Sequence, residues 1–165
     1  MNYEIREMVP TDEVRVLEIF QQGIDGKMAT FDTELPSAGA WNDSYLNDCR
    51  WVVENENSLV VGWCALKPTS KRACFSGVAE VSIYFDENYR EKGLGTLLLK
   101  KLILDSENHG YWTLQSNIFT DNESSIRFHQ KNGFRIVGER KNVGQLDGVW
   151  KDVIMMEKRS ERVGI

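Results

Sequence analysis

The chain has 165 residues, 41% of them hydrophobic and 27% charged, so it can bury one core without disulfide bonds or metals. Its formal net charge of −5 argues against nucleic acid or an anionic membrane as the main partner, because both favour a broad basic surface. The longest apolar run, Leu59–Leu66, has only the length of a strand, and the charged start does not resemble a signal peptide.

The first third of the chain predicts one strand and two helices. Residues 3–7 alternate in the manner of a strand, and residues 10–13 begin a helix with acidic side chains in its first turn. The irregular stretch Gly26–Ala40 then leads into a short helix predicted at Trp41–Asp48.

The middle of the chain predicts three strands, Arg50–Glu54, Leu59–Lys67 and Val78–Phe85. The turn at residues 55–58 makes a hairpin of the first two, and residues 68–77 form a polar loop before the third.

The last third predicts two helices and three strands. In chain order these are the helix Gly95–Asn108, the strand Trp112–Phe119, the helix Asp121–Asn132, and the strands Phe134–Glu139 and Val149–Met156. Asp147-Gly148 is a good turn signal between the final pair. The order predicts a single α+β domain with a central mixed sheet over residues 1–158, followed by a frayed polar tail at 159–165.

A glycine-rich loop, Arg90-Glu91-Lys92-Gly93-Leu94-Gly95-Thr96, lies between the third middle strand and the long helix. A helix N-terminus presents unpaired N–H groups to an anion, and the two glycines allow the backbone to approach it closely. The string matches neither a Walker loop nor a dinucleotide fingerprint, in which Leu98 would have to be glycine. The loop therefore predicts a pyrophosphate site, with a simple tight turn as the alternative.

The residues around this loop carry a resemblance to a known family. Val81–Phe85 followed by Arg90-x-x-Gly93-x-Gly95 resembles the central motif of the GNAT superfamily of N-acetyltransferases. Asn122-x-x-Ser125-x-x-Phe128-His129-x-x-x-Gly133-Phe134 resembles the family's second helix motif. Segments similar to the phosphinothricin or methionine sulfoximine acetyltransferase branch are 29–34, 79–84 and 148–153.

The resemblance covers about residues 5–157 and implies a GNAT-like fold, a mostly antiparallel sheet flanked by about four helices. It implies direct transfer from acetyl-CoA to the amine of a small acceptor of the phosphinothricin, methionine sulfoximine or methionine sulfone class, and a homodimer. No metal is expected. The implied cofactor contacts are the main chain of Ile83, Tyr84 and Phe85, the backbone of Glu91, Lys92, Gly93, Leu94, Gly95 and Thr96, and the side chains of Asn122 and Ser125.

Acetylation needs a neutral amine, and the departing thiolate needs a proton or a stabilising donor. Strand alternation puts Glu80, Ser82 and Tyr84 on one face, and the branch has a glutamate proposed as the base at the first of these positions. Glu80 is therefore the predicted base, with an ion-paired edge carboxylate as the alternative. His129 stands where many relatives have a tyrosine general acid and this branch commonly has histidine. It is predicted as catalytic, with a structural histidine beside the core as the alternative.

Two other groups of reactive side chains are predicted to be structural. His109 ends the long helix, where the helix dipole accounts for it. Cys64 and Cys74 have no sequence-marked histidine partner, so apolar packing is favoured over an acyl-cysteine intermediate. The three cysteines form neither a CxxC pair nor an even set, which indicates a reduced cytoplasmic compartment.

The acceptor pocket is predicted to have walls from the segment around Phe31, from the loop that holds Arg72 and Phe75, and from Trp150. Arg72 is the predicted donor to an acceptor carboxylate, with a solvated loop cation as the alternative. Relatives often carry a cation after the aromatic residue, where this chain has Ser76, which weakens the case for anionic phosphinothricin. Two rival functions remain: acetylation of peptide, protein or other amines, and a non-catalytic acyl-CoA sensor.

Overall fold

The computed structural model describes residues 2–90 and 93–165, so Glu91 and Lys92 of the predicted phosphate loop lie outside the described residues. In the described part the strands are β1 (Tyr3–Glu7), β2 (Trp51–Asn55), β3 (Val60–Pro68), β4 (Val78–Phe85), β5 (Thr113–Phe119), β6 (Arg135–Leu146) and β7 (Val149–Arg159). The α-helices are α1 (Glu13–Asp25), α2 (Ala38–Ser44), α3 (Leu94–Asn108) and α4 (Glu123–Lys131).

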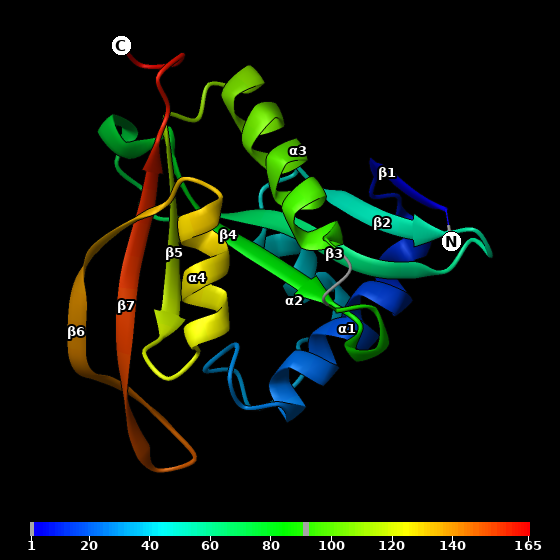
Figure 1. Cartoon of the computed structure of the whole chain (residues 1–165), viewed down its shortest axis with the longest axis horizontal. Coiled ribbons are helices and arrows are strands. Elements are labelled where there is room, and N and C mark those ends of the chain that lie inside the picture. Colours follow the sequence, from blue (N-terminus) through cyan, green and yellow to red (C-terminus); the bar gives the residue numbers. More distant parts are fainter. Residues whose placement is uncertain (1, 91–92) are drawn as a thin grey trace.

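The strands form one sheet in the order β1-β2-β3-β4-β5-β7-β6 (Figure 1). Neighbouring strands are antiparallel except β4 and β5, which are parallel. The predicted α+β class with a mixed, mostly antiparallel sheet is therefore confirmed. No helix in the described part combines the length and apolar character needed to cross a membrane.

Helices cover both faces of the sheet. Figure 1 shows α3 and α4 on one face and α1 and α2 on the other. Helix α1 buries an apolar stripe at helical spacing against Trp63 of β3, and α3 does the same against β2, β3 and β4. The buried positions are Val16, Ile19, Phe20 and Ile24 on α1, and Leu94, Leu98, Leu99 and Leu102 on α3.

The second helix lies earlier in the chain than predicted. The helix predicted at Trp41–Asp48 is observed as α2, which begins at Ala38 and ends at Ser44. It begins early because the side chain of Ser37 caps it, accepting a hydrogen bond from the backbone N–H of Ala40 at 3.1 Å. Tyr45 already has extended backbone, which ends the helix.

The last hairpin is longer than predicted, because β6 and β7 continue to pair through polar residues on an exposed edge. Asp147 and Gly148 have φ of 50° and 79°, as the predicted turn requires. The tail predicted to fray is instead held by hydrogen bonds. The backbone N–H of Ser160 donates to the carbonyl of Trp112 at 2.8 Å, and its hydroxyl donates to Glu107 at 2.7 Å.

A buried carboxylate ties α1 to the end of β4. Asp86 is only 4% exposed and accepts hydrogen bonds from the guanidinium of Arg15 at 2.6 Å and from the amide of Gln22 at 3.0 Å. Burial by itself would raise the pKa of Asp86. The hydrogen bonds from Gln22, the backbone of Asn88 and Arg15 outweigh it and lower the pKa to about 2.

We expect this carboxylate to make folding stability depend on pH in acid. The folded-state pKa of Asp86 lies below its ordinary value of 3.8, so its contribution is present above about pH 4 and is lost as the pH falls toward 2. The contribution is roughly 2 kcal/mol of unfolding free energy. Denaturant unfolding should show a difference in unfolding free energy between the wild type and Asp86→Asn, and this difference should shrink as the pH falls from 4 to 2. A free-energy difference that is the same at every pH would show that ionisation of Asp86 does not stabilise the fold.

Candidate active site

The parallel pair β4 and β5 separates along its length. The two strands are paired only where Val78–Glu80 meets Thr113–Gln115, whereas β5 remains paired with β7 as far as Phe119. Figure 1 shows the two arrows diverging from this common start. Within the described part of the chain, the edge of β4 from residue 81 to 85 therefore faces a gap rather than a strand.

The ladder with β3 determines which main-chain groups face this gap. The backbone N–H of Asp86 donates to the carbonyl of Val61 at 2.9 Å, and alternate residues of an antiparallel strand bond to the same neighbour. The backbone of Tyr84, two residues earlier, is therefore hydrogen-bonded to the backbone of Trp63, its partner on β3. The main chains of Ile83 and Phe85 point the other way, toward the gap, which leaves them available to a ligand.

A first cavity, which we call the outer cavity, lies where this gap meets the start of α3. Its volume is about 320 Å³, and its lining includes Ile83, Phe85, Gly93, Gly95, Thr96 and Ser125. Gly93 caps α3 with φ of +73°, a conformation that residues with a side chain rarely adopt. A Cβ on Gly95 would lie 3.2 Å from the Phe128 ring, so glycine allows α3 to approach α4. The side chain of Leu94 is buried in the core, so only its backbone, as predicted, can face the cavity.

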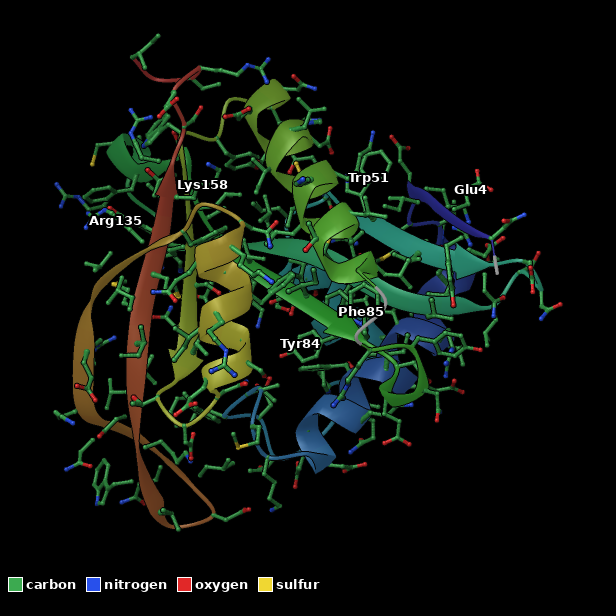
Figure 2. All side chains as sticks on the ribbon, in the orientation of Figure 1. Glu4, Trp51, Tyr84, Phe85, Arg135 and Lys158 are labelled. Atoms are coloured by element: carbon green, nitrogen blue, oxygen red, sulfur yellow. The ribbon has the colours of Figure 1, made fainter. Side chains whose placement is uncertain are left out.

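A second cavity, the inner cavity, of about 250 Å³ continues from the first along β4. Ile83 and Ser125 line both cavities, and Glu80, His129 and Phe31 line the inner one. Tyr84, predicted as a cofactor contact, also lines the inner cavity, on the opposite face of β4 from Phe85. Figure 2 labels both residues near the end of the strand.

Glu80 is half-buried in the inner cavity, and its carboxylate makes no hydrogen bond or ion pair with the described residues. Lys67 lies directly opposite it on β3 and also lines the cavity. The Lys67 ammonium is instead 4.8 Å from the centroid of the Tyr45 ring, a cation–π contact. Burial raises the pKa of Tyr45 to about 12, and its hydroxyl donates to Ser82 at 3.0 Å. A carboxylate and an ammonium group thus face one cavity without neutralising each other.

His129 is buried, with 3% of its surface exposed, and both ring nitrogens have partners. Nδ1 lies 2.8 Å from the carbonyl of Ser125, which can only accept, so Nδ1 carries the proton. Nε2, 3.1 Å from the hydroxyl of Ser116, therefore accepts. Burial lowers the pKa of His129, so the ring is neutral at neutral pH.

The segment before α2 closes the inner cavity. Phe31 packs edge-on against Phe119 with ring centroids 4.7 Å apart. The Asn122 amide donates to the carbonyl of Met28 at 3.0 Å, while its oxygen accepts from the backbone N–H of Ser125 at 3.4 Å. Asn122, predicted as a cofactor contact, therefore caps α4 and holds this segment in place.

Three predicted substrate residues are not among those that line the inner cavity in the described chain. Arg72 and Phe75 are exposed on the connection between β3 and β4, with the guanidinium 5.4 Å from the centroid of the Phe75 ring. Trp150 is 57% exposed near the turn of the last hairpin. Sequence reasoning missed Lys67. No local sequence signal marks it, because its place opposite Glu80 depends on the register of β3 and β4.

Comparisons with known proteins show the family and the fold of the chain. The model of the acetyltransferase (GNAT) family matches residues 16–134. An L-methionine sulfoximine/L-methionine sulfone acetyltransferase of Pseudomonas paraeruginosa is 27% identical over 162 residues, which are 95% of this chain and 94% of that protein. Two solved structures are also similar. A phosphinothricin acetyltransferase from Sinorhizobium meliloti in complex with AcCoA has a TM-score of 0.85 at 26% identity, covering 99% of this chain and 96% of that one. A ribosomal-protein-alanine N-acetyltransferase from Brucella melitensis has a TM-score of 0.86 at 28% identity, covering 95% and 99%.

Proposed function

The chain belongs to the acetyltransferase (GNAT) family, and from this premise we propose that it acetylates the α-amine of a small amino-acid-like acceptor. It is an acetyl-CoA-dependent N-acetyltransferase of the phosphinothricin and methionine sulfoximine acetyltransferase-like branch. The choice of acceptor rests on one observation: Glu80 and Lys67 are paired across β4 and β3, and both line the inner cavity.

The outer cavity and the open edge of β4 suit acetyl-CoA. The N-terminus of α3 and the backbone at Gly93–Thr96 can bind phosphate groups, and the main-chain groups of Ile83 and Phe85 can pair with the amides of the pantetheine arm. Acetyl-CoA supplies the thioester. Because the two cavities meet at Ile83 and Ser125, a thioester bound along β4 would reach the inner cavity, where the acceptor amine would attack.

The charges of the inner cavity fit the head group of an α-amino acid. In a zwitterion the ammonium and carboxylate are bonded to the same carbon, and Glu80 and Lys67 are adjacent residues of opposite charge. The volume of about 250 Å³ is below the roughly 300–1,000 Å³ of drug-sized sites, which favours a small acceptor. Lys67 is the one lysine or arginine in the described lining, so a neutral side chain, as in methionine sulfone or methionine sulfoximine, fits better than anionic phosphinothricin.

We assign the roles in catalysis accordingly. Glu80 takes the proton from the acceptor ammonium, directly or through water, and the neutral amine attacks the thioester carbonyl. The C–S bond breaks as the amide bond forms, and the proton that the amide nitrogen loses goes to the departing thiolate of CoA, directly or through water. His129, with the proton on Nδ1, accepts from the Ser116 hydroxyl, which supports a positioning role rather than proton donation. The homodimer implied by the resemblance stays a prediction.

Thiol release from acetyl-CoA tests the acceptor class. The panel is methionine sulfone, methionine sulfoximine, phosphinothricin, common amino acids, and alanine-starting peptides, because the similar Brucella melitensis protein is named as a ribosomal-protein-alanine N-acetyltransferase. We expect the fastest release with a free amino acid that has a neutral side chain. Faster release with peptides would favour the rival acceptor class, and binding of CoA without any release would favour a sensor.

We expect Lys67→Met to raise KM for amino-acid acceptors by about 10- to 100-fold, because it removes a charge-assisted bond to the acceptor carboxylate. The matched control is Arg72→Met, which removes an exposed loop cation outside the inner cavity and should change KM by less than about 2-fold. With the decarboxylated amine of the same acceptor, the penalty of Lys67→Met should disappear. If Arg72→Met raised KM more than Lys67→Met, Arg72 on the connection between β3 and β4 would be the residue that binds the acceptor carboxylate.

A further inference from the structure

A cluster of three metal-ligating side chains lies away from both cavities. Cys49 stands just before β2, and Asp105 and His109 lie one turn apart at the C-terminal end of α3. Their ligand atoms all lie within 4.8 Å of one another. Figure 2 labels Trp51, two residues after Cys49, beside α3. The sequence predicts no metal here, because 60 positions separate Cys49 from His109 and only the packing of α3 on the sheet brings them together.

Two of the three ligand–ligand distances in the cluster match those of a tetrahedral zinc site, and the third is no more than 4.8 Å. Zinc binds sulfur at about 2.3 Å and nitrogen or oxygen at about 2.0–2.1 Å, so tetrahedral angles place S and N about 3.6 Å apart and N and O about 3.3 Å apart. The Cys49 sulfur is 3.7 Å from Nδ1 of His109, and that nitrogen is 3.3 Å from Oδ1 of Asp105. The side chains are therefore placed so that one ion can bind all three with little movement.

The surroundings hold the ligands in place. The indole N–H of Trp51 donates to Oδ2 of Asp105 at 2.9 Å, which orients the carboxylate and leaves Oδ1 directed at His109. Nδ1 of His109 now contacts the carbonyl of Asp105 at 2.9 Å. That carbonyl also accepts the backbone N–H of His109 at 3.1 Å, so it keeps a partner if Nδ1 turns to an ion.

An adjoining cavity provides access and negative charge. Its volume is about 330 Å³, and Glu7, Glu13 and Asp48 line it together with the cluster. Arg50 also lines this cavity, but its guanidinium donates to the carbonyl of Leu46 at 2.6 Å and to other groups of the α2–β2 connection. No described residue of this cavity lines the inner or outer cavity, so an ion here would be separate from the acetyl transfer.

We propose that Cys49, Asp105 and His109 bind one divalent cation of the zinc class, with water from the adjoining cavity as the fourth ligand. On binding, the thiol of Cys49 loses its proton to solvent and the sulfur bonds to the ion. The proton on Nδ1 of His109 moves to Nε2, so that Nδ1 can bind the ion. The ion joins the end of α3 to the start of β2 and stabilises the fold without taking part in catalysis.

The test is titration of the reduced, metal-free full chain with Co²⁺, which reports thiolate ligation through a near-ultraviolet charge-transfer band. We expect the wild type to bind one ion with this band, Cys49→Ser to lose the band, and His109→Gln to bind at least about 10-fold more weakly. The matched control Cys74→Ser removes an exposed thiol outside the cluster and should keep the band and the affinity.

Thermal unfolding with and without Zn²⁺ provides a second readout. We expect Zn²⁺ to raise Tm of the wild type and of Cys74→Ser, but not of His109→Gln. The His109 side chain is 43% exposed, so this variant remains informative even if Cys49→Ser fails to fold. The proposal is overturned if the wild type shows no charge-transfer band, if the band persists in Cys49→Ser, or if His109→Gln binds Co²⁺ as tightly as the wild type.

Discussion

Glu80→Gln is expected to lower kcat/KM by about 10²- to 10⁴-fold at neutral pH, the usual contribution of a single general base. The substitution keeps the shape of the side chain and removes its ability to take a proton. The Glu80 carboxylate makes no hydrogen bond or ion pair with the described residues, so its loss leaves no partner unsatisfied and the fold should be unaffected. Turnover should persist, because holding the amine and the thioester together can itself contribute roughly 7–11 kcal/mol.

The pH dependence separates a base from a residue that merely shapes the pocket. As the pH rises the acceptor amine loses its proton to solvent, so the deficit of Glu80→Gln should shrink at high pH. The matched control is Glu4→Gln on β1, an exposed strand glutamate far from both cavities, which Figure 2 labels at the edge of the sheet. A deficit of the same size at every pH, or a rise in KM for the acceptor alone, would show that Glu80 binds substrate without taking the proton.

Leu98→Ala is expected to lower the unfolding free energy by about 2–5 kcal/mol. Leu98 is 0% exposed in the core cluster between α3 and the sheet, so truncation leaves a cavity that the surrounding side chains fill only in part. For a chain of this length such a loss corresponds to a fall in Tm of roughly 5–15 °C. Denaturant unfolding would measure the change directly.

The neighbouring leucine is the control for this measurement. Leu97 is 56% exposed on the same turn of α3, so Leu97→Ala should change stability by less than about 0.5 kcal/mol. Both variants remove the same atoms from the same helix, so the difference between them measures burial alone. Equal effects would mean that helix propensity, rather than packing of this face on the sheet, determines the stability of α3.

Patterns within short stretches of sequence predicted most of the fold. In the described residues, the order of the seven strands and four α-helices follows from alternating strands, periodic helices and turn residues. Gly93 takes the positive φ expected of a glycine in the predicted loop. The errors lie where that local signal is weak. The cap at Ser37 starts the second helix earlier than the apolar pattern indicates. The polar part of the last hairpin pairs through its backbone, for which side-chain patterns give little signal.

In the candidate site, too, the residues marked by local motifs were predicted, whereas a residue placed by strand register was not. Ile83, Phe85, Gly93, Gly95, Thr96 and Ser125 were predicted from motifs and line the outer cavity, because a strand, a glycine loop and the helix after it are contiguous or regularly spaced. The cation that lines the inner cavity was not among the predicted residues. Arg72 is predicted as the carboxylate donor because its guanidinium can bind a carboxylate through two hydrogen bonds. Lys67 instead reaches the cavity from the neighbouring strand through the register of β3 and β4.

The class of fold and the glycine loop at the start of α3 could be read from the sequence, because backbone preferences and side-chain periodicity act over a few residues. Glu80 as the candidate base came from the family resemblance, and strand alternation added only the face of the strand on which it lies. Three features appear only in the folded chain: which charges share a cavity, the separation of β4 and β5 after Glu80, and the contact between Cys49 and His109. These features depend on contacts between residues far apart in the chain, which helix packing and strand register bring together.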